Sequence, residues 1–113
     1  MIKVYQIQLT RAEEFAVNRD GWDSTPKAKA YINRSFSRTF DPSTFQYYTH
    51  VANVDVDDME AAFEAMNLWQ ESKYFRQVKR LSPCSSMSVG DILEKDGEFY
   101  RCASFGFDKV SIL

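Results

Sequence analysis

The sequence predicts an α+β fold in a single domain spanning residues 1–113, with the order β-α-α-β-α-β followed by a C-terminal antiparallel β-meander. Three observations predict this class. Segments 2–9 and 45–56 have strand-like patterns, helix start signals precede three segments with helical spacing of apolar residues, and an Asp96-Gly97 turn separates two strand-like runs. The length is usual for one domain, and no repeat or linker divides the chain.

Residues 2–9 alternate between apolar and polar side chains, as expected for a strand with one buried face. The alternation slips between Val4 and Tyr5, which predicts either a bulge or burial on both faces.

Nine Phe, six Tyr and two Trp make up 15% of the chain. Because rings fill space efficiently, they predict an aromatic core, with a ring-bearing binding surface as the alternative.

Thr10 and Glu13 form a capping box, in which the Thr10 hydroxyl accepts from the Glu13 N–H and the Glu13 carboxylate accepts from the Thr10 N–H. A short helix is expected to follow, with Phe15 and Ala16 facing inward. Gly21 marks its end, since glycine commonly follows the last helical residue.

Pro26 predicts the start of a second helix over residues 26–36, because proline at the first helical position gives up only an unpaired N–H.

Residues 45–56 are rich in β-branched and aromatic side chains and predict a strand. Asp55 or Asp57 is expected to open a third helix, since carboxylates suit the positive end of the helix dipole. The expected apolar stripe of this helix is Met59, Ala62, Phe63, Met66 and Trp69.

Residues 73–81 predict another strand, and the terminal meander follows. We interpret residues 86–91 as the bend into this meander, with Gly90 supplying backbone freedom and Asp91 supplying turn hydrogen bonds. After the Asp96-Gly97 turn, one more short strand is expected beyond Gly106. This interpretation assigns no role to the side chains of Ser86 and Ser88.

The composition excludes several classes of function. Sixteen acidic and 14 basic residues give a net charge of −2, so bulk attraction to nucleic acid and imitation of DNA are both unexpected. No apolar run approaches the length of a membrane span, and no signal peptide is evident. Cys84 and Cys102 lack zinc spacing and are expected to be reduced thiols. We therefore expect a protein of the host cell cytoplasm, with no membrane association and no cofactor.

The sequence contains no catalytic or metal motif. His50 is the only histidine and lies within a predicted strand, so a structural role is favoured over acid–base chemistry. Asp55, Asp57, Asp58 and Glu60 crowd one corner, but helix capping explains them without a bound cation. Nothing beside Cys84 in the sequence except Arg80 would activate its thiol. We expect neither a catalytic nor a metal-binding residue, and hence no enzyme.

Three segments carry a family resemblance. Residues 1–7 read Met-Ile-Lys-Val-Tyr-Gln-Ile, residues 47–52 read Tyr-Tyr-Thr-His-Val-Ala, and residues 86–107 contain Ser-Met-Ser-Val-Gly-Asp, then Asp-Gly, Tyr and Phe-Gly-Phe. In these segments the chain resembles small uncharacterised proteins carried by bacteriophages and other mobile elements. The resemblance implies an origin and no reaction. Proteins of this kind often bind a host protein and alter it, for example as antagonists of a defence system.

The leading expectation is a non-enzymatic accessory protein that binds a host protein. Exposed rings and arginines are enriched at binding hot spots, and the residues chosen on this ground are Trp22, Arg34, Arg38, Tyr47, Tyr48, Arg76 and Arg80. The alternative is a nucleic-acid-binding module, in which basic residues track phosphates and rings stack on bases. Its residues are Lys73, Arg76, Lys79 and Arg80. Self-association through an exposed strand edge is a further possibility.

Overall fold

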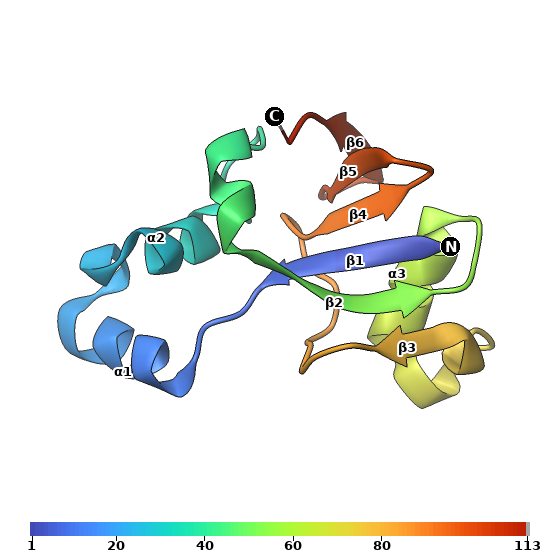
Figure 1. Ribbon diagram of the computed structural model, residues 1–113, viewed down its shortest axis with the longest axis horizontal. Coiled ribbons are helices and arrows are strands. Elements are labelled where there is room, and N and C mark those ends of the chain that lie inside the picture. Colours follow the sequence, from blue (N-terminus) through green and yellow to red (C-terminus); the bar gives the residue numbers. More distant parts are fainter. Residues whose placement is uncertain (113) are drawn as a thin grey trace.

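The computed structural model describes residues 1–112 and contains one six-stranded antiparallel sheet with helices, so the predicted α+β class is confirmed (Figure 1). The strands lie in the order β3-β2-β1-β4-β5-β6. Their bounds are β1 Ile2–Ile7, β2 Tyr48–Val54, β3 Val78–Arg80, β4 Ile92–Lys95, β5 Glu98–Cys102 and β6 Phe107–Val110. The α-helices are α1 Arg11–Asp20, α2 Pro26–Asn33 and α3 Met59–Leu68.

Four short 3-10 helices separate these elements: η1 Trp22–Ser24, η2 Pro42–Tyr47, η3 Trp69–Glu71 and η4 Phe75–Gln77. Two of them replace predicted strand. Asp41 accepts a hydrogen bond from the Ser43 N–H and starts η2, so β2 begins only at Tyr48. The Ser72 hydroxyl likewise accepts from the Tyr74 N–H just before η4, and only the last residues of the predicted 73–81 strand pair with β2.

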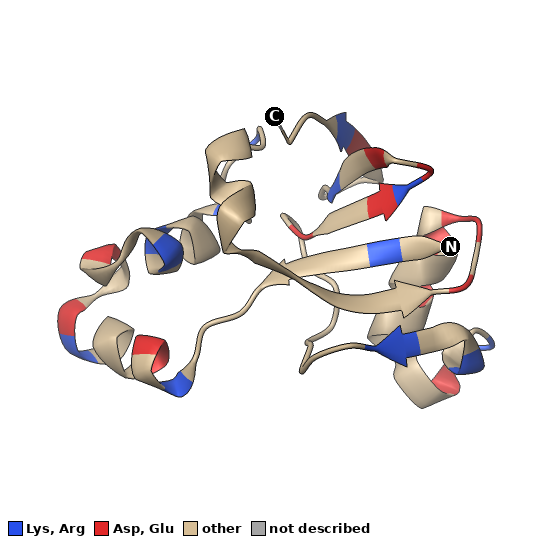
Figure 2. Ribbon diagram, in the orientation of Figure 1, with Lys and Arg blue, Asp and Glu red and all other residues tan. Residues whose placement is uncertain are grey.

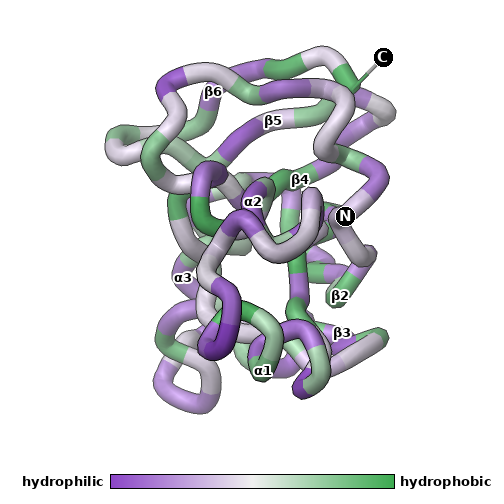
Figure 3. The backbone as a smooth tube through the Cα atoms, turned by 90° about the vertical axis from the view of Figure 1, so that its left-hand side faces the viewer, coloured by the Kyte–Doolittle hydropathy of each residue, from purple (hydrophilic) through white to green (hydrophobic). Residues whose placement is uncertain are grey.

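Helix α3 covers one face of the sheet, and the turned view in Figure 3 places it on a single side of β2 and β3. Its N-cap is Asp58, so neither Asp55 nor Asp57 opens the helix as predicted. The reason is that the Asp55 N–H still donates to the Gln77 carbonyl, which prolongs strand pairing past β2. Phe63, a member of the predicted apolar stripe, is 38% exposed.

The core between α3 and the sheet is aliphatic, which corrects the predicted aromatic core. Most of its buried members come from β1, β2, β4 and α3, with Met87 and Cys102 added, and none of the buried residues of the described chain is aromatic. Trp69, Tyr74 and Phe107 pack against this core only as partly buried rings. The rings gather elsewhere. Tyr5 packs against Phe45, His50 and Phe99 with ring centroids 5.0–6.0 Å apart.

Two sequence expectations about the strands are confirmed. The pairing of β1 with β2 shifts register between Val4 and Tyr5, as the slip in alternation predicted. Strands β4 and β5 form the predicted hairpin, and Asp96 and Gly97 both take a positive φ, of 52° and 79°, at its turn.

Helix α1 and helix α2 lie beyond one end of the sheet (Figure 1). The capping box of α1 is present as predicted, with the Thr10 N–H 2.8 Å from Glu13 Oε1. The predicted inward position of Phe15 is wrong, because α1 packs mainly on the short η1 and leaves this ring 71% exposed. Helix α2 is shorter than predicted, since the Phe36 and Ser37 N–H groups turn back to the Asn33 carbonyl.

Candidate functional site

A depression opens where α3 ends and β3 begins, with a cavity volume of about 740 Å³. We call it the α3–β3 depression. Its lining residues come from the end of α3, from η3, from η4 and from β3: Leu68, Trp69, Gln70, Glu71, Phe75, Arg76, Val78 and Arg80. Trp69 ends the helix with a φ of 51°, a left-handed conformation that is costly for a bulky residue and persists only where its surroundings enforce it.

Two of the predicted binding residues meet in this depression. The Arg80 guanidinium lies over the Trp69 ring, with its central carbon 4.1 Å from the ring centroid. Arg76 lies on the neighbouring η4 and is exposed. Neither arginine forms an ion pair within residues 1–112, so both charges remain available to a ligand.

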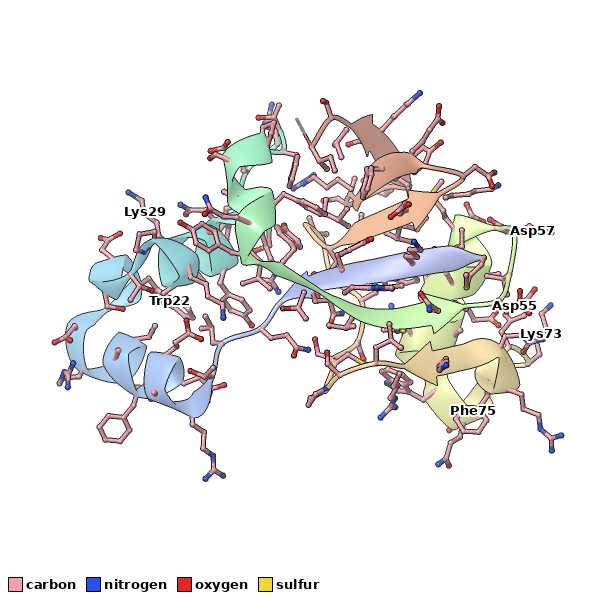
Figure 4. All side chains as sticks on the ribbon, viewed as in Figure 1. Trp22, Lys29, Asp55, Asp57, Lys73 and Phe75 are labelled. Carbon is pink, nitrogen blue, oxygen red and sulfur yellow. The ribbon has the colours of Figure 1, made fainter. Side chains whose placement is uncertain are left out.

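Apolar side chains surround these arginines. Leu68 is 48% exposed, Phe75 is 43% exposed, and Leu81 lies just beyond β3 with a similar exposure. Figure 4 places Phe75 at the same end of the molecule as Lys73. Leu68 and Phe75 thus bring two large, partly exposed apolar groups to the lining of the depression.

The basic residues of the predicted nucleic-acid site do not form one uniform patch. Lys73 lies over the Tyr74 ring at 5.1 Å, at the end of the molecule that also carries Asp55 and Asp57 (Figure 4). Lys79 is exposed on β3. Figure 2 shows the basic segments around β3 beside acidic segments of α3 and its preceding loop, so the two signs of charge alternate here.

The other predicted binding residues lie away from this depression, on η1, at the end of α2 and beyond it, and where η2 meets β2. Trp22 stacks on Tyr31 with centroids 5.7 Å apart, and Arg38 is exposed. Arg34, Tyr47 and Tyr48 line a second cavity of about 370 Å³. The seven predicted residues therefore do not form a single surface.

Residues 86–91 are held by a buried polar network, which supports their interpretation as a bend. Asp91 is 1% exposed, and its Oδ2 accepts from Gln6 Nε2 at 3.1 Å and from the Ser88 N–H at 2.9 Å. Burial raises the pKa of the Asp91 carboxyl to about 6, against the lowering effect of the Ser88 N–H and of Arg34. Sequence reasoning did not find Gln6, because a lone polar residue in a strand carries no signal of its distant partner.

Two other residues fasten the same bend. The Tyr48 hydroxyl donates to the Gly90 carbonyl at 2.6 Å, which gives this predicted binding residue a structural role. Asn67 Oδ1 accepts from the Met87 N–H at 2.7 Å. Gly90 has a φ of 94°, and a β-carbon there would collide with the Arg34 carbonyl. The bend therefore requires glycine for two independent reasons.

The residues considered for acid–base or thiol chemistry occupy structural settings. His50 stacks on Tyr5, and its Nε2 lies 2.7 Å from Asn53 Oδ1. Burial raises the pKa of the Cys84 thiol, and Arg80 only partly opposes this effect. Within residues 1–112 no three His, Cys, Asp or Glu side chains are grouped to hold a metal ion, and no helix is long and apolar enough to cross a membrane.

Comparisons of this chain with protein-family models, with curated proteins and with solved structures found no match.

Proposed function

We propose that this chain is a non-enzymatic accessory protein of phage or mobile-element origin that binds a host protein through the α3–β3 depression. One observation carries the proposal. Arg76 and Arg80, which form no ion pair in the described chain, lie beside exposed apolar side chains around one depression. Tryptophan and arginine are the residue types enriched at binding hot spots, and a concave centre excludes water from the contacts made there.

The Arg80 side chain is already ordered in the unbound protein by its stacking on Trp69. Stacking on the indole holds the guanidinium in one orientation and leaves its edge N–H groups free to donate to a carboxylate. A side chain that is already ordered loses less conformational entropy on association. The pair therefore favours an acidic side chain on the partner.

The partner that fits this surface is an extended segment with a bulky apolar side chain beside an acidic one. The apolar group would pack on Leu68 and Phe75, and the acidic group would pair with Arg80 or Arg76. Strand β3 is at the edge of the sheet, so its outer side offers backbone groups to a segment that adds a strand.

Two observations favour a protein partner over nucleic acid. Arg80 covers a face of Trp69 and Lys73 lies over Tyr74, so these rings are less available for stacking on bases. Glu71 also lines the depression and would repel a phosphate backbone.

The test places a photo-crosslinking amino acid at position 70, inside the depression, and exposes the protein to lysate of the host. The crosslinked protein is then purified and its affinity is measured by calorimetry for two charge-reversal variants. Arg80→Glu should weaken binding by ~30-fold, as loss of a hot-spot arginine typically does. The matched control is Arg38→Glu, which reverses an exposed arginine elsewhere and should change the affinity little.

Equal affinities for the two variants would show that the depression is not the binding surface. A gel-shift assay with single- and double-stranded DNA and RNA at two salt concentrations tests the alternative. Salt-sensitive binding that is lost in the double variant Arg76→Ala, Arg80→Ala would replace the proposal by nucleic-acid binding.

A further inference from the structure

The second cavity lies between α2 and η2, and Arg101 of β5 also lines it. Its volume of about 370 Å³ falls within the range of small-molecule sites. Three cationic side chains, Lys29, Arg34 and Arg101, line this cavity, whereas Asp41 is its only acidic lining residue. The Asp41 carboxylate already accepts from the Ser43 N–H at 3.0 Å and from the Ser43 hydroxyl at 2.8 Å, so it serves to start η2.

Arg101 is a buried cation without an acidic partner. Arg101 is only 5% exposed. Its Nη2 donates to the Arg34 carbonyl at 3.0 Å and to the Ser37 carbonyl at 2.5 Å. No carboxylate within residues 1–112 forms an ion pair with it, and its Nε and Nη1 make no hydrogen bond to that part of the chain. A buried guanidinium in this state attracts an anion, because carbonyl dipoles compensate its charge only in part.

Arg34 does not have a full counter-ion either. Its Nε lies 3.6 Å from Asp91 Oδ1, which is longer than a hydrogen bond, and this buried Nε has no hydrogen-bond partner among the described residues. The other oxygen of Asp91 is already shared by Gln6 and Ser88. Arg34 thus has one distant carboxylate and Arg101 has none within the described residues, so the wall of the cavity carries an excess of positive charge.

The outer part of the cavity adds unpaired donors. The Lys29 side chain projects into solvent from α2 (Figure 4) and forms no ion pair within the described chain. The Tyr47 hydroxyl also makes no hydrogen bond there, and the Phe40 ring supplies an apolar wall. The lining therefore combines unpaired cationic and hydroxyl donors with a surface for a small apolar body.

We propose that this cavity binds a small organic anion, whose phosphate or carboxylate group pairs with Arg101 and Lys29 while its apolar part packs against Phe40 and Tyr47. The site is separate from the α3–β3 depression and goes beyond the proposed binding of a host protein. A bound anion would also fasten the end of α2 to η2, since both elements contribute to the cavity.

The experiment is a titration of the isotope-labelled protein, followed by amide NMR, with phenyl phosphate, benzoate and the uncharged benzyl alcohol. Saturable shifts around α2, η2 and Arg101 are expected with at least one anion and not with the alcohol. The anion that binds more tightly identifies the group as phosphate or carboxylate. Lys29→Gln changes an exposed lysine and Tyr47→Phe removes an unbonded hydroxyl from a half-buried ring, and each should weaken binding by ~3- to 10-fold.

The matched control is Lys79→Gln, which removes an exposed lysine on β3 and should leave the affinity unchanged. The proposal is overturned if neither anion gives saturable shifts at millimolar concentration. It is equally overturned if Lys29→Gln and Tyr47→Phe bind as the unmodified protein does, or if benzyl alcohol binds as well as the anions.

Discussion

Asp91 is expected to make the stability of this fold depend on pH between about pH 4 and pH 6. Its carboxyl is buried, and its pKa rises from 3.8 in the unfolded chain to about 6 in the folded protein. The protonated form is therefore favoured by folding. The contribution of Asp91 to stability is fully present below pH 3.8 and is lost as the pH rises through about 6.

The size of this effect follows from the shift. Each pKa unit corresponds to about 1.4 kcal/mol, so a shift of about two units makes the free energy of unfolding fall by about 3 kcal/mol across the interval. Urea denaturation at a series of pH values measures this change directly. The Asp91→Asn variant carries a neutral side chain at every pH, so this decline should disappear in it.

Asp96→Asn is the matched control, because Asp96 is an exposed aspartate at the hairpin turn, where asparagine tolerates the positive φ of 52°. This variant should keep the decline of the unmodified protein. The reasoning about Asp91 is refuted if Asp91→Asn shows the same decline, or if the stability of the unmodified protein rises from pH 4 to pH 6.

Two further predictions concern the bend over residues 86–91. Gly90→Val should lower the unfolding free energy by about 2–5 kcal/mol, because the new side chain is strained at this φ and collides with the Arg34 carbonyl. The control Gly97→Ala meets no atom within 4 Å and should cost about 1–2 kcal/mol. Equal melting temperatures for the two variants would contradict this reasoning. The double variant Ser86→Ala, Ser88→Ala should melt like the unmodified protein, since both side chains are exposed and only the Ser88 backbone contacts Asp91. A large drop in melting temperature, or loss of partner binding with unchanged melting, would show that these hydroxyls have a role.

Features with local causes were predictable from the sequence. The capping box of α1 and the Asp96-Gly97 hairpin depend on residues a few positions apart, so their pattern is visible in the chain. The register shift at Val4 was also visible, because burial on alternate sides follows directly from strand geometry. From such elements the α+β class follows.

Features with distant causes were not predictable. Phe15 has the spacing of an inward residue, but α1 lies beyond the sheet and finds no surface on which to bury it. The segment 73–81 has strand-like residues, yet hydrogen bonds at Ser72 turn its first part into η4. Local propensity was overridden in both cases by where neighbouring elements pack.

The candidate sites show the same division. Residue types alone selected Arg76, Arg80, Arg34 and Tyr48 as candidates, because arginines and rings suit binding. The stacking of Arg80 on Trp69 joins residues 11 positions apart across η3 and η4, and the hydrogen bonds from Arg101 reach 64 and 67 positions back along the chain. No sequence pattern records such pairings, since they arise only when the sheet brings its strands and helices together.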